Sequence, residues 1–100
     1  MILMLKKVAL IAVAALPVIA VADVPAKEAL CRSCHGASDA APIMPAYPKL
    51  AGQNKEYLIA AIKAYRDGSR KGGMAAVMAA SAMGLSDTDI ESLAEYYSSQ

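Results

Sequence analysis

Two cysteines and the only histidine of the chain lie within five residues, in the segment CRSCHG at positions 31–36. Cys31 and Cys34 are three residues apart, so on a helix both sulfur atoms face the same side. His35 follows directly and can turn an imidazole nitrogen toward a metal on that side. The pattern C-x-x-C-H is the local signature of covalent haem attachment, in which two thioether bonds hold the porphyrin and the histidine ligates its iron.

Other kinds of site also use cysteine pairs. A structural zinc site needs four ligands, and two cysteines with a single histidine leave it one short. A thioredoxin-like redox pair belongs beside a strand and a helix of a βαβ fold, and the sequence shows no strand pattern. A plain disulfide in a haem-free protein stays open as an alternative, although it does not explain why His35 follows Cys34. We therefore predict one covalently attached haem c.

The size and composition of the chain favour one small domain that needs a ligand in its interior. The 100 residues include no Trp and no Phe and only five Tyr, and much of the apolar content is alanine, which fills little volume. Small domains that bury little of their own surface usually need a disulfide, a metal or a partner to be stable. A bound porphyrin would supply the missing bulk.

The N-terminal segment 1–22 has the pattern of an export signal. Two lysines at 6–7 precede a short apolar run over 8–16, and a small-x-small cleavage motif, Ala-Val-Ala, occupies 20–22. The apolar run is shorter than the roughly 18 to 20 residues of a membrane span. We expect cleavage at this motif, a periplasmic domain of residues 23–100 and no stable membrane insertion; an uncleaved membrane anchor is the alternative.

The charge balance excludes one class of partner. Removing the lysines at 6–7 leaves eight of the ten Lys and Arg residues, against nine Asp and Glu. A nucleic-acid-binding domain needs a basic surplus on one face, and a nearly neutral chain offers none. We expect no nucleic-acid partner.

Three helices are predicted in the mature segment, the first over 25–35 with a proline in its first turn. The second covers 55–67, with Asn54 as its N-cap and Gly68 at its C-terminal stop. The third begins after Ser86, where SDTD resembles a capping box with Asp in place of Glu. Apolar stripes at helical spacing comprise Leu58, Ile62 and Tyr65 on the second helix, and Ile90, Leu93, Ala94 and Tyr97 on the third.

Two irregular stretches separate these helices. Residues 36–52 carry three prolines without a helical period, which is typical of a loop. Residues 68–84 could hold a helical turn or two around 75–82, but their glycines and methionines favour something other than a plain helix. The predicted fold class is all-α, with loops that are long for a bare helical bundle of this size.

The chain resembles the small class I cytochromes c of bacterial periplasms, and above all the branch that includes dihaem cytochromes built from two such domains. The resemblance covers residues 29–100 and rests on CRSCHG, YPKLAGQNKEYL and the C-terminal LSDTDIESLAEYYSSQ. It implies a small cytochrome c fold, in which three main helices and long loops wrap around one covalently bound haem.

The resemblance also implies a methionine as the second axial ligand of the iron. Four methionines follow His35, and each could instead be a core residue that fills an irregular gap: Met44, Met74, Met78 and Met83. In this branch the ligand precedes, by a short and fairly constant stretch, the Leu-Ser that opens the last helix. In MAASAMGLS that position is Met78, and Met74 and Met83 are the alternatives.

One neighbour of the iron ligands follows from the same resemblance. A proline in a P-x-L-x-G segment, here Pro48, is expected to accept a hydrogen bond from His35 through its carbonyl and to fix the imidazole. Three cations, Arg66, Arg70 and Lys71, could neutralise a haem propionate, but a solvated surface is the usual place for such charges and the one we expect.

A haem iron held by histidine and methionine has no open coordination position and transfers one electron at a time. The resemblance therefore implies a periplasmic single-haem electron carrier with transient redox partner proteins, not an enzyme; the sequence does not indicate the oligomeric state. Two other functions stay open: a haem subunit of a larger oxidoreductase complex, and a ligand-binding haem protein with an open distal site.

Overall fold

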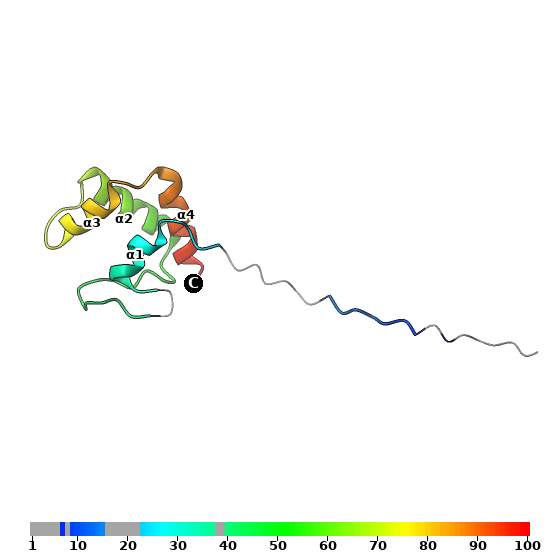
Figure 1. Cartoon of the computed structure of the whole chain (residues 1–100). Coiled ribbons are helices and arrows are strands. Elements are labelled where there is room, and N and C mark those ends of the chain that lie inside the picture. The colour runs from blue at the N-terminus through cyan, green and yellow to red at the C-terminus, as the bar shows by residue number, and fades with distance from the viewer. Residues whose placement is uncertain (1–6, 8, 16–22, 38–39) are drawn as a thin grey trace, which may run out of the picture.

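This computed structural model describes residues 7, 9–15, 23–37 and 40–100. These residues contain four α-helices and no strand (Figure 1). The helices are α1 (Glu28–His35), α2 (Lys55–Asp67), α3 (Ala75–Ala82) and α4 (Asp87–Ser98). The predicted all-α class is confirmed. Among these residues no helix is both long and apolar enough to cross a membrane. The expected cleavage motif at 20–22 lies outside the described residues.

The second predicted helix has the expected bounds, because local residues fix both of its ends. The Asn54 side chain accepts a hydrogen bond of 2.9 Å from the Tyr57 N–H, which satisfies a donor that the first turn leaves free. Gly68 ends α2 in the left-handed conformation, with φ of 81°, where a side chain would be strained.

A full capping box starts α4, as predicted. The Ser86 hydroxyl accepts from the Asp89 N–H at 3.1 Å, and the Asp89 carboxylate accepts from the Ser86 N–H at 2.9 Å. The Lys27 ammonium also contacts the Asp89 carboxylate at 2.9 Å and donates to the Gly84 carbonyl at 2.9 Å. This lysine therefore ties the entry of α1 to the start of α4.

Two helical expectations need correction. The first helix begins at Glu28 and not at residue 25, because a turn closed by the Glu28 N–H and the Pro25 carbonyl precedes it. The stretch 75–82 is a plain helix, α3, so the expectation of something else there was wrong. Its glycines, Gly72 and Gly73, lie before the helix, and alanine, the strongest helix former, supplies five of its eight residues.

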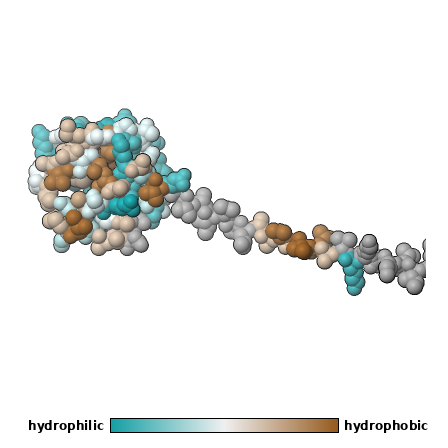
Figure 2. All heavy atoms as spheres, in the orientation of Figure 1, coloured by the Kyte–Doolittle hydropathy of each residue, from teal (hydrophilic) through white to brown (hydrophobic). Residues whose placement is uncertain are grey.

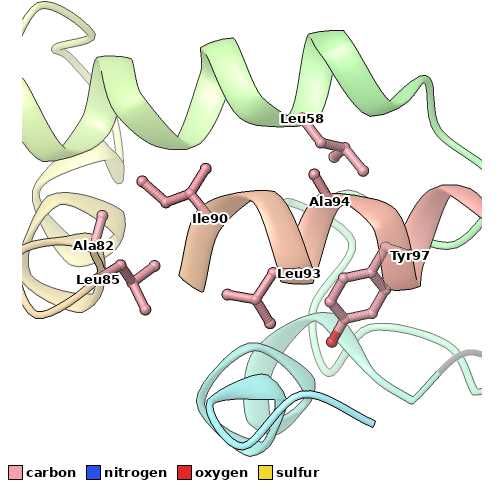
Figure 3. Packing of buried hydrophobic residues seen from close by; sticks show 7 residues of the cluster. All are labelled: Leu58, Ala82, Leu85, Ile90, Leu93, Ala94 and Tyr97. Carbon is pink, nitrogen blue, oxygen red and sulfur yellow. The ribbon is translucent and has the colours of Figure 1, made fainter. Parts of the chain in front are cut away.

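The hydrophobic core lies on both sides of α4, which sits between α2 and α1 (Figure 3). Its largest fully buried side chains are Ile90 and Leu93. α2 packs against both α3 and α4. The buried cluster contains the whole predicted stripe of α4 and consists of Leu58, Ala82, Leu85, Ile90, Leu93, Ala94 and Tyr97. The Tyr97 hydroxyl points to α1 and donates a 2.9 Å hydrogen bond to Glu28.

Candidate haem-binding site

A cavity of about 430 Å³ is lined by residues of all four helices and of the loop before α2. Its volume lies in the range of sites that hold cofactors, roughly 300 to 1,000 Å³. The cavity brings together the five residues singled out for haem binding, which are Cys31, Cys34, His35, Pro48 and Met78. Leu58, Leu93 and Ala94 from the buried core form part of its wall, so one apolar surface serves both the core and the cavity.

The last turn of α1 presents the two cysteines to this cavity. Both are free thiols and both are half-buried. Gly36 ends the helix with φ of 82°, and a Cβ at this position would lie only 2.6 Å from the Ala41 carbonyl oxygen. The Ile43 N–H donates to the Cys34 carbonyl at 3.0 Å. The glycine thus lets the following loop fold back against the cysteine turn.

His35 is buried, and its ring is held by one strong contact. Its Nδ1 lies 2.7 Å from the Pro48 carbonyl oxygen. A carbonyl can only accept, so Nδ1 carries the proton and the neutral ring offers the lone pair of Nε2. This is the arrangement in which a histidine ligates a metal through Nε2. That Pro48 serves an iron ligand in this way stays a prediction.

Met78 on α3 faces the free nitrogen of His35. Its Sδ lies 3.4 Å from Nε2. With Nδ1 protonated, Nε2 and Sδ both carry lone pairs, so these two atoms could act as ligands of a haem iron. Met74, which is 42% exposed, also borders the cavity, whereas Met44 and Met83 do not line it.

Next to the cysteine turn lies a buried carboxylate. Glu28 accepts from the Tyr97 hydroxyl through Oε1, and its Oε2 lies 3.3 Å from Arg32 Nε without the angle of a hydrogen bond. Burial and, secondarily, the Glu28 charge raise the pKa of the Cys31 thiol to about 11. Burial, followed by the bond to Glu28, also raises the pKa of Tyr97. Cys31 is therefore a neutral thiol at neutral pH.

Sequence reasoning did not place several side chains that the structure brings to the cavity. The Tyr47 ring centre lies 5.9 Å from that of His35, and Gln53 and Tyr57 also line the wall. The position of Tyr47 immediately before Pro48 was the available signal. Arg66 has a structural role instead, with bonds of 3.1 Å to the Leu85 carbonyl and 2.6 Å to Asp87.

The donor set of the cavity fits a covalently bound haem c. Two thiols, the imidazole nitrogen that does not contact Pro48 and one thioether sulfur line a single cavity. Thiols can form the bonds to the porphyrin edge, and nitrogen and thioether sulfur are common axial ligands of haem iron. The predicted haem c and the residues present are therefore compatible.

Known proteins share this sequence and fold. The family profile described as cytochrome c matches residues 26–100. Cytochrome c-554(548) of Halomonas halodenitrificans is 55% identical over 74 residues, which are 74% of this chain and 88% of that relative. Cytochrome c4 of Pseudomonas aeruginosa is 40% identical over 75 residues, 75% of this chain and 35% of that relative. The chain thus spans about a third of the length of this longer relative.

A solved structure has the same fold. It is the cytochrome c4 of Acidithiobacillus ferrooxidans, which superposes with a TM-score of 0.70 at 36% sequence identity. The match covers 73% of this chain and 43% of that one. The predicted small cytochrome c fold is therefore confirmed, with α3 as a fourth helix beside the three that the sequence predicted.

Proposed function

The chain belongs to the cytochrome c family, and from this premise we propose that it is a periplasmic carrier that passes single electrons between redox partner proteins. The bound haem c supplies the one-electron chemistry of its iron. The residues of the chain bind this group, orient it and keep water from it. No substrate is converted.

We assign His35 and Met78 as the axial ligands of the iron, and Cys31 and Cys34 as the residues that would bind the porphyrin through thioether bonds. The observation that carries this assignment is the 3.4 Å approach of Met78 Sδ to His35 Nε2, while His35 Nδ1 is occupied by the Pro48 carbonyl. Two filled axial positions favour electron transfer over the binding of a small ligand. A thioether ligand and an apolar wall both favour the ferrous state and so raise the reduction potential.

Partner proteins would dock where the cavity reaches the surface. Leu30 on α1 and Val77 on α3 border the cavity and are each 47% exposed. Hydrophobic residues also lie scattered over the face of the domain that Figure 2 shows. Small apolar contacts of this kind suit brief encounters between electron-transfer proteins. The matched relatives bear the names of cytochromes, which supports a carrier with transient partners.

Residues 1–22 would be removed on export, leaving a mature domain of residues 23–100. In the described part of this segment, residues 9–15 form no helix and all have exposed side chains (Figure 2). An apolar segment that contributes nothing to the core is what a cleavable signal requires. Mass spectrometry of the exported protein should show the mass of residues 23–100 plus one haem; a full-length chain held in the membrane would contradict this part of the proposal.

The ligand assignment is tested by Met78→Leu beside Met83→Leu as the matched control. We expect Met78→Leu to lose the ferric absorption band at the red end of the visible spectrum, which marks thioether ligation, to lower the midpoint potential and to bind carbon monoxide readily when reduced. Met83→Leu should resemble the wild type, because Met83 is exposed. Identical spectra and potentials for both variants and the wild type would refute the assignment.

A further inference from the structure

Four cations of the helical domain are engaged with carboxylates. Each has a nitrogen within 4.0 Å of an Asp or Glu oxygen, and they are Lys27, Arg32, Lys55 and Arg66. Arg70 and Lys71 differ: both line the cavity, and within the described residues neither has a carboxylate at that distance. Both side chains are exposed, as expected of surface charges, and both also border the cavity.

The backbone and one aromatic ring hold Arg70 at the cavity. The left-handed Gly68 turns the chain back, and the Arg70 N–H donates to the Ala64 carbonyl at 3.1 Å. The guanidinium carbon lies 4.6 Å from the ring centre of Tyr65, which itself lines the cavity. A cation–π contact of this geometry orients a guanidinium and leaves its N–H groups free to donate in the ring plane.

The cavity wall offers no other charge among the described residues. Its remaining titratable groups are Cys31, Cys34, His35, Tyr47, Tyr57, Tyr65 and Tyr97, and no carboxylate is among them. Glu28 lies behind Tyr97, on the far side of its hydroxyl. A haem carries two propionate carboxylates, and a carboxylate that leaves water needs a cation or hydrogen-bond donors. Arg70 and Lys71 are the groups in the wall that meet this need.

We propose that Arg70 binds a haem propionate through its guanidinium fork, with Lys71 as a second positive charge beside it. The proposal rests on the proposed function, since it presupposes a bound haem. A guanidinium matches a carboxylate with two parallel N–H donors, whereas an ammonium acts as a single point charge. The pair keeps the propionate ionised and places positive charge near the iron, which disfavours the oxidised state.

The test compares the wild type, Arg70→Gln and Lys63→Gln. Lys63 is the matched control, because it is a half-exposed cation of α2 that does not line the cavity. The measurement is the midpoint potential of the haem protein across the pH range, with visible spectra to verify unchanged ligation. For Arg70→Gln we expect a lower potential at neutral pH and a redox-linked carboxyl pKa that rises by about one unit or more. Lys63→Gln should reproduce the wild-type curve.

Coinciding curves for Arg70→Gln and Lys63→Gln would overturn the proposal. If Arg70→Gln does not accumulate as a haem protein, Arg70→Lys is compared with the wild type instead: it keeps the charge and removes the fork, so its midpoint potential at neutral pH should be lower than that of the wild type. A wild-type curve for Arg70→Lys would then contradict the proposal. Failure of the wild type itself to show a reversible haem potential would instead refute the proposed function, so the two failures are distinguishable.

Discussion

The two sides of the last helix are packed in different ways. Where α4 meets α2 away from the cavity, the chain fills its own interior: Ile90 is fully buried and does not line the cavity. On the cavity side, Leu30 and Val77 are each 47% exposed and Met74 42% exposed. One side is thus a finished protein core, and the other is a shell of apolar side chains around a space. The comparison teaches that the porphyrin is needed as packing material as well as for its iron.

The composition of the chain explains this division. Without Trp or Phe, and with alanine at many apolar positions, 100 residues provide enough bulk for one side only. A domain of this size buries a small share of its surface, and its stability is correspondingly low unless a ligand adds to the core. The same ligand that transfers the electron therefore contributes to folding.

Removal of both thioether attachments should have the largest effect on stability. The loss should be concentrated in α1 and α3, which border the cavity. In Cys31→Ala/Cys34→Ala, we expect the amides of α1 and α3 to exchange hydrogen nearly as fast as in an unfolded chain, while those of α2 and α4 keep more of their protection. Hydrogen exchange read by mass spectrometry checks this. Ser33→Ala, an exposed change on α1, is the control. Equal loss of protection in all four helices would contradict the division into two sides.

Truncation inside the finished core should come next. Ile90→Ala deletes a fully buried side chain and should lower the free energy of unfolding of the haem protein by about 2 to 5 kcal/mol. Ile43→Ala removes the same atoms from a side chain that is 64% exposed and should change it by less than about 0.5 kcal/mol. Denaturant unfolding measures both. Similar costs for the two variants would show that the core is not where the structure places it.

A glycine substitution sharpens the comparison at the cysteine turn. Gly36 and Gly72 both have positive φ, 82° and 93°, but only Gly36 has backbone atoms within 4 Å of a built Cβ. Gly72→Ala should therefore cost about 1 kcal/mol from strain alone. Gly36→Ala should cost about 2 kcal/mol or more, because the Ala41 carbonyl must also move. Thermal unfolding of the two haem proteins checks the order, which the opposite ranking would disprove.

The smallest effect on stability is expected from protonation of Asp89 at acidic pH. The Ser86 N–H and then the Lys27 ammonium hold the pKa of Asp89 below its ordinary value of 3.8. Since the folded pKa is the lower one, this contribution is complete above the unfolded value and is lost as the pH falls through the folded value. Between about pH 5 and pH 3, the melting temperature of Asp89→Asn should thus decline less than that of the wild type.

Glu56→Gln is the control for this pH series. Its exposed carboxylate has no cation within 4.0 Å among the described residues, so this variant should follow the wild type. Because the Asp89 side chain is 28% exposed, added salt should shrink the difference between Asp89→Asn and the wild type. If the melting temperatures of all three proteins fall in parallel with pH, Asp89 does not contribute to the pH dependence of stability.

The parts of the fold set by neighbouring residues were predictable from the sequence. Asn54, Gly68 and Ser86 determine helix ends through contacts within three or four residues, and these ends lie where they were expected. α3 was missed because it is apolar all round and has no stripe that marks it as a helix. Its packing against α2 is a tertiary contact, which no local pattern reports.

The candidate site likewise has a part that neighbouring residues predict and a part that depends on contacts between distant residues. The spacing of Cys31, Cys34 and His35 sufficed to predict haem attachment, because two thioether bonds and one iron ligand can come from neighbouring positions of one helix. The choice of Met78 needed a family resemblance, because its contact with His35 joins residues 43 positions apart. The bond between Tyr97 and Glu28 spans 69 positions, and no sequence signal identifies it.

Tyr97 joins three regions of the domain. Its hydroxyl bonds to α1, its carbonyl accepts from the Gly52 N–H at 2.8 Å, and its ring closes the cavity wall. Cys31 and Cys34 precede Tyr97 in the sequence, so a growing chain exposes the cysteine turn before it adds the side chain that encloses that turn. Haem attachment can therefore take place on an open turn, and closure of the domain awaits the last helix.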